Sequence, residues 1–140
     1  MAASDITRGQ LERNLSQKLQ AFYFEKIGRR PERITCQFFD EKLAMVLERI
    51  ITPSERLLLE SQRPEFAYQL RNQIDIEMKP LLQAILEEIL GTGVDTILIN
   101  SDLKKDVSGI IAVLSNIPSI RDPESIPKVK REKVITSNNE

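Results

Sequence analysis

The feature that most constrains the fold of this chain is a short pattern that it uses twice. Each copy reads as helix end, glycine, strand, polar turn and strand, over residues 22–47 and 85–114. Gly28 lies six residues before Ile34, and Gly91 lies six residues before Ile97. Two apolar runs separated by a short polar turn indicate a β-hairpin. The pattern therefore predicts an α+β fold in which two helix–β-hairpin units form a four-stranded antiparallel sheet backed by helices.

Length and composition indicate one ordinary soluble domain. The chain has 140 residues, of which 41% are hydrophobic and 29% charged, with a formal net charge of −1. A chain of this length can form one sizeable core. We expect residues 1–118 to form the α+β domain and residues 119–140, which are rich in proline and basic residues, to form a flexible tail.

The first unit begins with an amphipathic helix from Thr7 to Ile27. Its apolar residues recur at helical spacing, and they are Leu11, Leu15, Leu19 and Phe22. A hairpin follows, with strands at residues 33–40 and 42–49. The single cysteine, Cys36, lies on the apolar face of the first strand, where a small buried residue is expected more often than a reactive thiol.

A helical connection joins the two units. Thr52 and Glu55 have the spacing of a capping box, and Pro53 suits the first position of a helix that we expect to end near Ser61. A longer helix runs from Pro64 to Leu90, and Pro80 predicts a kink or break inside it. Its expected buried stripe consists of Phe66, Leu70, Ile74, Met78, Leu81, Ile85 and Ile89.

The second hairpin has predicted strands at residues 94–100 and 107–115. Both hairpins carry apolar residues on both faces, while the helices between them can cover only one face of the sheet. An apolar face left open favours a homodimer, with exchange of the first helix as one form of it.

No pattern in the chain points to catalysis. The chain has no histidine, so the commonest acid–base group and metal ligand is missing, and no serine has an evident base partner. The Gly91–Gly93 segment follows the negative end of a helix, whereas phosphates bind at helix N-termini. We therefore predict no enzyme activity, no cofactor and no metal site.

The candidate binding residues are three arginines in the first helix–strand loop. Arg29, Arg30 and Arg33 form either a solvated loop or a site for an anionic ligand or an acidic partner. The basic stretch 128–133 is either solvated or a contact for acidic lipid or a partner. The net charge and the lack of aromatic–basic patterning argue against nucleic-acid binding. No transmembrane segment and no secretory signal are expected, which places the chain in the cytoplasm or at the inner face of the plasma membrane.

Two short motifs carry a family resemblance. The Gly28–Pro31 loop and the helix start Ile51–Glu55, in this order of elements, resemble the MpsC-like (YbcI-like) family of small soluble bacterial proteins. A glycine-arginine-glycine-proline loop and a leucine-threonine-proline-alanine-glutamate helix start are typical of that family. Here Arg30, Ile51 and Ser54 stand in place of the second glycine, the leucine and the alanine.

The resemblance covers residues 6–117 and implies a function. The family is named for a Na⁺-translocating, membrane-potential-generating system, and related systems take up inorganic carbon. The resemblance implies association with such a system, and from this we expect a non-enzymatic cytosolic accessory or regulatory protein that acts through protein–protein interaction with a membrane subunit of an ion or bicarbonate uptake system. The alternatives are a small-anion or nucleotide-sensing regulatory homodimer, with the three arginines as its site, and an enzyme.

Overall fold

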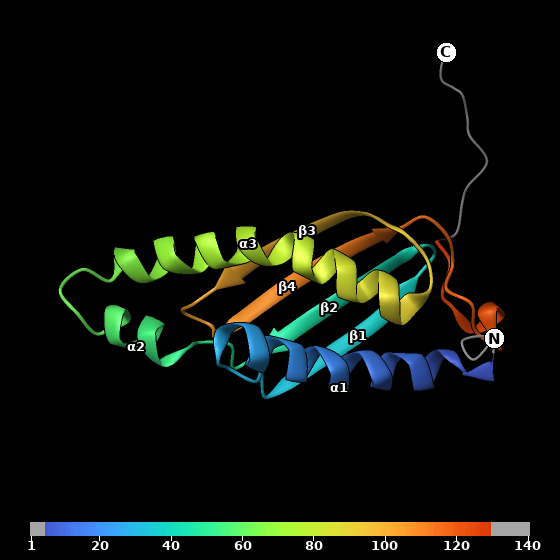
Figure 1. Ribbon diagram of the computed structural model, residues 1–140, viewed down its shortest axis with the longest axis horizontal. Coiled ribbons are helices and arrows are strands. Elements are labelled where there is room, and N and C mark those ends of the chain that lie inside the picture. Colours follow the sequence, from blue (N-terminus) through green and yellow to red (C-terminus); the bar gives the residue numbers. More distant parts are fainter. Residues whose placement is uncertain (1–4, 130–140) are drawn as a thin grey trace, which may run out of the picture.

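The computed structural model describes residues 5–129 (Figure 1). Its α-helices and strands agree with the sequence-based ranges to within two residues at each end. They are α1 (Arg8–Ile27), β1 (Arg33–Phe39), β2 (Lys42–Glu48), α2 (Pro53–Leu59), α3 (Glu65–Leu90), β3 (Val94–Asp102) and β4 (Val107–Leu114). One turn of 3₁₀ helix, η2 (Pro123–Ser125), lies in the segment that was expected to be a flexible tail. The predicted α+β class is confirmed.

The four strands form one antiparallel sheet in the order β1-β2-β4-β3. The two hairpins join through their second strands, so that Met45 of β2 faces Ile110 of β4. The first strand of each hairpin therefore lies at an edge of the sheet. Helices α1 and α3 both cross the same face of this sheet (Figure 1).

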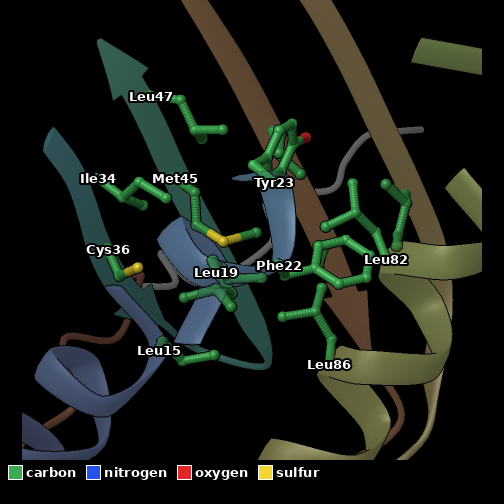
Figure 2. Packing of buried hydrophobic residues seen from close by; sticks show 14 of the residues in the cluster. Leu15, Leu19, Phe22, Tyr23, Ile34, Cys36, Met45, Leu47, Leu82 and Leu86 are labelled. Atoms are coloured by element: carbon green, nitrogen blue, oxygen red, sulfur yellow. The ribbon is translucent and has the colours of Figure 1, made fainter. Parts of the chain in front are cut away.

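The core lies between that face and the two helices. Figure 2 shows Phe22 of α1 beside Leu82 and Leu86 of α3, above the strands. Phe22 and Tyr23 meet edge to face at 6.0 Å between ring centroids. Cys36 is buried in this core, as predicted, and burial raises the pKa of its thiol to about 11.

Local sequence signals set the helix ends. Gly28 and Gly91 follow α1 and α3 in the left-handed conformation, with φ of 75° and 68°, where a side chain would be strained. The predicted capping box of Thr52 and Glu55 opens α2. A second capping box, between Thr7 and Gln10, opens α1.

The helix α3 runs unbroken through Pro80. The prediction of its buried face was wrong, because apart from Met78 each residue that it buries lies one position after a residue of the predicted stripe. Of that stripe Met78 is buried, whereas Phe66 and Leu81 are exposed. The buried row is Ala67, Arg71, Asp75, Met78, Leu82, Leu86 and Leu90. A search for apolar residues at helical spacing could not find this row, because two of its members are charged.

Residues 118–129 also pack on the domain. Ile120 and Ile126 are buried in the core. Arg8 N–H donates to the Asp122 carboxylate at 2.8 Å, and Asp40 N–H donates to the Pro127 carbonyl at 2.8 Å. This part of the expected flexible tail is therefore held in place, while residues 130–140 lie outside the described part of the chain.

Candidate functional site

A buried ion pair joins α2 to α3. Arg71 Nε lies 2.6 Å from Glu55 Oε2, and Arg71 Nη2 lies 2.6 Å from Glu55 Oε1. The two side chains are 3% and 0% exposed. Arg71 Nη2 also donates to the Ile50 carbonyl at 2.7 Å. A two-pronged pair of this kind has a fixed geometry, so it sets the position of α2 relative to α3.

Glu55 has two roles in this pair. Its carboxylate accepts from Thr52 N–H at 2.8 Å and from Thr52 Oγ1 at 3.0 Å, which completes the capping box of α2. The same carboxylate receives the Arg71 guanidinium. The hydrogen bonds of this buried carboxylate come from Thr52 and Arg71, which helix α2 and helix α3 hold in fixed positions.

Asp75, one turn further along α3, connects this polar cluster to the sheet. Its Oδ2 accepts from Ser101 Oγ of β3 at 2.7 Å, and Ser101 Oγ lies 2.6 Å from Ser108 Oγ of β4. Burial raises the pKa of the Asp75 carboxyl, while the Ser101 hydrogen bond and the charge of Arg71 oppose that rise. Asp75 also acts on Tyr23 of α1: burial chiefly, and then the charge of Asp75, raises the pKa of the Tyr23 hydroxyl.

The turn between β3 and β4 holds the segment that leads into α2. Asp106, with φ of 58°, accepts on Oδ1 from Ile50 N–H at 2.7 Å and from Ile51 N–H at 3.0 Å. Its carbonyl accepts from Arg49 N–H at 2.9 Å. The turn thus fixes the backbone whose Ile50 carbonyl receives Arg71.

A cleft of about 300 Å³ opens beside this cluster, between α3 and β3. We call it the α3–β3 cleft. Arg71 Nη1, which is buried, has no hydrogen-bond partner within residues 5–129. The lining of the α3–β3 cleft offers one guanidinium, one carboxylate, and hydroxyl and amide groups, a set suited to hydrogen bonding a small polar group. The lining residues are Tyr68, Gln69, Arg71, Asn72, Asp75, Asn100, Ser101 and Leu103.

The three predicted arginines are spread over the surface. Arg29 Nε donates to the Arg49 carbonyl at 2.9 Å, Arg33 lies 3.9 Å from the Glu48 carboxylate, and Arg30 is exposed. Arg33 lines a groove of about 400 Å³ between α1 and β1, together with Arg13. Arg29 and Arg30 do not line that groove. Their assignment as binding residues stays a prediction.

Sequence reasoning missed the cluster around Arg71. It identified Glu55 only as a capping residue, considered Ser101 only as a serine without a base partner, and did not single out Arg71 or Asp75. The available signal was the spacing: Ala67, Arg71 and Asp75 recur every four residues and extend the row Leu82, Leu86 and Leu90 towards the N-terminus of α3. This spacing shows that the residues share one face of the helix, but it does not show that the face is buried.

Apolar side chains also remain exposed on α2 and the first half of α3, and α2 and the start of α3 extend beyond the ends of the strands (Figure 1). We call these two segments, residues 53–78, the α2–α3 arm. Leu57 is 71% exposed and Phe66 42% exposed, and Tyr68 and Ile76 are exposed as well. The Arg63 guanidinium lies 5.8 Å from the centre of the Phe66 ring. Aromatic residues and arginine are enriched at protein–protein interfaces.

Neither a membrane span nor a metal centre is found in the part of the chain that the structure describes. Within residues 5–129, no helix combines the length and apolarity that crossing a bilayer requires. The same residues contain no cluster of three or more histidine, cysteine, aspartate or glutamate side chains arranged to hold a metal ion.

The fold and site define a small α+β protein in which a one-sided helical layer on an antiparallel sheet holds a buried polar cluster and carries an exposed apolar arm. The chain belongs to the MpsC family, whose model, described as Na⁺-translocating membrane potential-generating system (MpsC), matches residues 7–116. The predicted resemblance is therefore confirmed. No curated protein and no solved structure shows significant similarity to the chain.

Proposed function

We propose that this protein is a non-enzymatic accessory or regulatory component that binds a membrane subunit of a Na⁺-translocating system at the inner face of the plasma membrane. The family description supports involvement in such a system. An inorganic-carbon or bicarbonate uptake complex is the specific system that we propose.

The observation that carries this proposal is the exposed apolar surface of the α2–α3 arm. Leu57, Phe66 and Ile76 lie in solvent although the arm is anchored by a buried ion pair. A rigid arm loses little conformational freedom on binding, which favours its use as a docking element. The occupant that fits is an apolar surface with charges of both signs at its rim, since the arm exposes Arg56 and Arg63 as well as Glu60 and Glu65.

The test is binding to the solubilised membrane subunits of the same system. Purified wild-type protein is expected to co-elute with them, and Leu57→Ser with Phe66→Ser is expected to abolish co-elution while leaving the circular dichroism spectrum unchanged. Phe24→Ser is the matched control, because Phe24 is exposed to a similar extent on α1. Equal co-elution of all three proteins, or none with wild type, overturns the proposal.

A second candidate function is sensing of a small anion or nucleotide in the α3–β3 cleft. The unpartnered Nη1 of Arg71 favours it, whereas the Asp75 carboxylate in the same cleft weakens binding of an anion. A thermal-shift panel of nucleotides, bicarbonate and phosphorylated metabolites tests it. A rise in Tm that Asn72→Ala removes supports sensing, and a flat panel contradicts it.

A further inference from the structure

The outer strand β3 has backbone groups open for pairing. In a central strand, successive residues bond alternately to the two neighbouring strands. In β4, Leu114 N–H donates to the Glu41 carbonyl on the β2 side at 2.8 Å, and Ser115 N–H, just after the strand, donates to the Gly93 carbonyl on the β3 side at 2.8 Å. The odd-numbered residues of β4 therefore bond to β3.

The register then shows which groups of β3 face outwards. Leu98 lies opposite Ile111, and Asn100 lies opposite Gly109, so these residues bond to β4. Ile97 and Ile99 alternate with them and direct their N–H and C=O groups away from β4, at the edge of the sheet. Within residues 5–129, no loop, turn or cap segment and no side chain donates to or accepts from these four groups.

Side chains close both ends of this edge and leave its centre open. At one end, the Val94 carbonyl accepts from Gln83 Nε2 at 3.0 Å, and Val94 N–H donates to Glu87 Oε2 at 2.9 Å. At the other end, Ser101 N–H donates to Asn100 Oδ1 at 3.0 Å. The open stretch is centred on Leu98.

The opposite edge of the sheet is protected differently. Along β1, Ser16 Oγ donates to the Ile34 carbonyl at 2.7 Å, and Phe38 N–H donates to Glu12 Oε2 at 3.3 Å. Gln37 Nε2 also donates to the Phe38 carbonyl at 3.1 Å. Protein edges are commonly blocked in this way, or by lysine or proline. The centre of β3, from Thr96 to Asn100, has none of these devices.

We propose that a second copy of this chain pairs with β3 in an antiparallel arrangement whose two-fold axis passes at Leu98. The sequence of β3 is self-complementary in that register. Ile97 lies opposite Ile99 of the second copy and Thr96 opposite Asn100, so no two like charges face each other in this stretch, which ends at the register shift beside Asp95. The open groups of Ile97 and Ile99 exchange hydrogen bonds, and the two sheets become one continuous eight-stranded sheet.

The exposure of Leu98 fits this register. Leu98 is 56% exposed on the sheet face that α1 and α3 leave uncovered. In the proposed pair it lies directly opposite Leu98 of the second copy, at a position without cross-strand hydrogen bonds, where side chains come closest. Pairing thus buries both leucines. The proposal rests on β3 alone and is independent of the function proposed for the α2–α3 arm.

Light scattering of the full chain tests the pairing. Wild-type protein is expected to have the mass of two chains, and Leu98→Lys the mass of one, because two lysines would face each other across the axis. Val46→Lys is the matched control, since Val46 is 44% exposed on the same face but lies on the inner strand β2. It is expected to stay dimeric, and circular dichroism checks that both variants fold.

Disulfide trapping gives a second, positive readout. The opposed Cα atoms in such a position lie about 4.5 Å apart, within reach of a disulfide bond. In a Cys36→Ala background, Leu98→Cys is expected to form a covalent dimer on mild oxidation, and Val46→Cys is expected not to. A monomeric wild type, a dimer that only Val46→Lys dissociates, or equal trapping at both positions overturns the proposal.

Discussion

Arg71 and Glu55 form a two-pronged ion pair with both contacts at 2.6 Å, and neither side chain is more than 3% exposed. The pair spans α2 and α3, and the cap of α2 uses the same carboxylate. A single contact therefore links a helix start, the entry segment at Ile50 and the long helix. The position of the α2–α3 arm depends on it.

Removing one partner of this pair is expected to destabilise the protein strongly. Glu55→Gln removes the charge that is hydrogen-bonded to the buried Arg71 guanidinium, which costs about 3–5 kcal/mol of the free energy of unfolding. Urea unfolding followed by circular dichroism measures the loss.

An exposed ion pair serves as the control for that measurement. Arg49 and Glu32 lie 3.3 Å apart, with side chains 64% and 71% exposed. Glu32→Gln is expected to cost less than about 1 kcal/mol, because solvent screens such a pair. Equal losses in Glu55→Gln and Glu32→Gln would contradict the structural role of the buried pair.

Asp75 predicts a pH dependence of stability at acidic pH. Burial raises its pKa in the folded protein, so the folded state keeps a proton that the unfolded chain has already released. The free energy of unfolding contributed by this group therefore falls as the pH rises from the unfolded pKa, about 3.9, through the raised folded value. Above that window, Asp75 in its charged form weakens the fold.

Asp75→Asn removes this effect and keeps an oxygen that accepts from Ser101. Urea midpoints measured from pH 3 upwards are expected to shift in favour of the variant as the pH rises through the window, and to stay constant relative to wild type above it. A variant that is less stable by the same amount at every pH would show that the carboxylate acts only as a packing group.

Features that depend on residues close together in the sequence could be predicted, whereas contacts between distant residues could not. Gly28, Gly91 and the Thr52–Glu55 box were predictable, because each acts within a few residues of itself. The buried face of α3 was not, because both Ile85 and Leu86 are apolar and only contact with the sheet selects between their rows. The Glu55–Arg71 pair joins residues on two helices, and no spacing in one sequence specifies such a partner. The packing of Ile120 and Ile126 depends in the same way on distant residues.

Two glycines are expected to respond to alanine in opposite directions. Gly91 has φ of 68°, a conformation that costs a residue with a Cβ about 1–2 kcal/mol, so Gly91→Ala destabilises. Gly9 lies in α1, where an added Cβ comes no closer than 3.8 Å to Arg13. Gly9→Ala is expected to stabilise by about 0.5–1 kcal/mol. Thermal unfolding of both variants checks the signs, and a stabilised Gly91→Ala would contradict the assigned helix end.

Cys36 predicts a second pH effect, at alkaline pH. Burial raises the pKa of its thiol to about 11 in the folded protein, against about 8.5 in an unfolded chain. Between these values the unfolded chain loses a proton that the folded protein keeps. The free energy of unfolding therefore falls with rising pH, by up to about 1.4 kcal/mol per pH unit.

Cys36→Ala lacks this thiol and is expected to show a shallower decline in urea midpoint between pH 8.5 and 10, a range chosen from these values. Wild-type thiol is also expected to react with iodoacetamide far more slowly in buffer than in urea, because alkylation needs an exposed thiolate. The raised pKa of Tyr23 lowers stability at still higher pH in both proteins, so it cancels from the comparison. Parallel pH profiles of the two proteins, or equally fast alkylation with and without urea, would show that Cys36 is reactive at the surface.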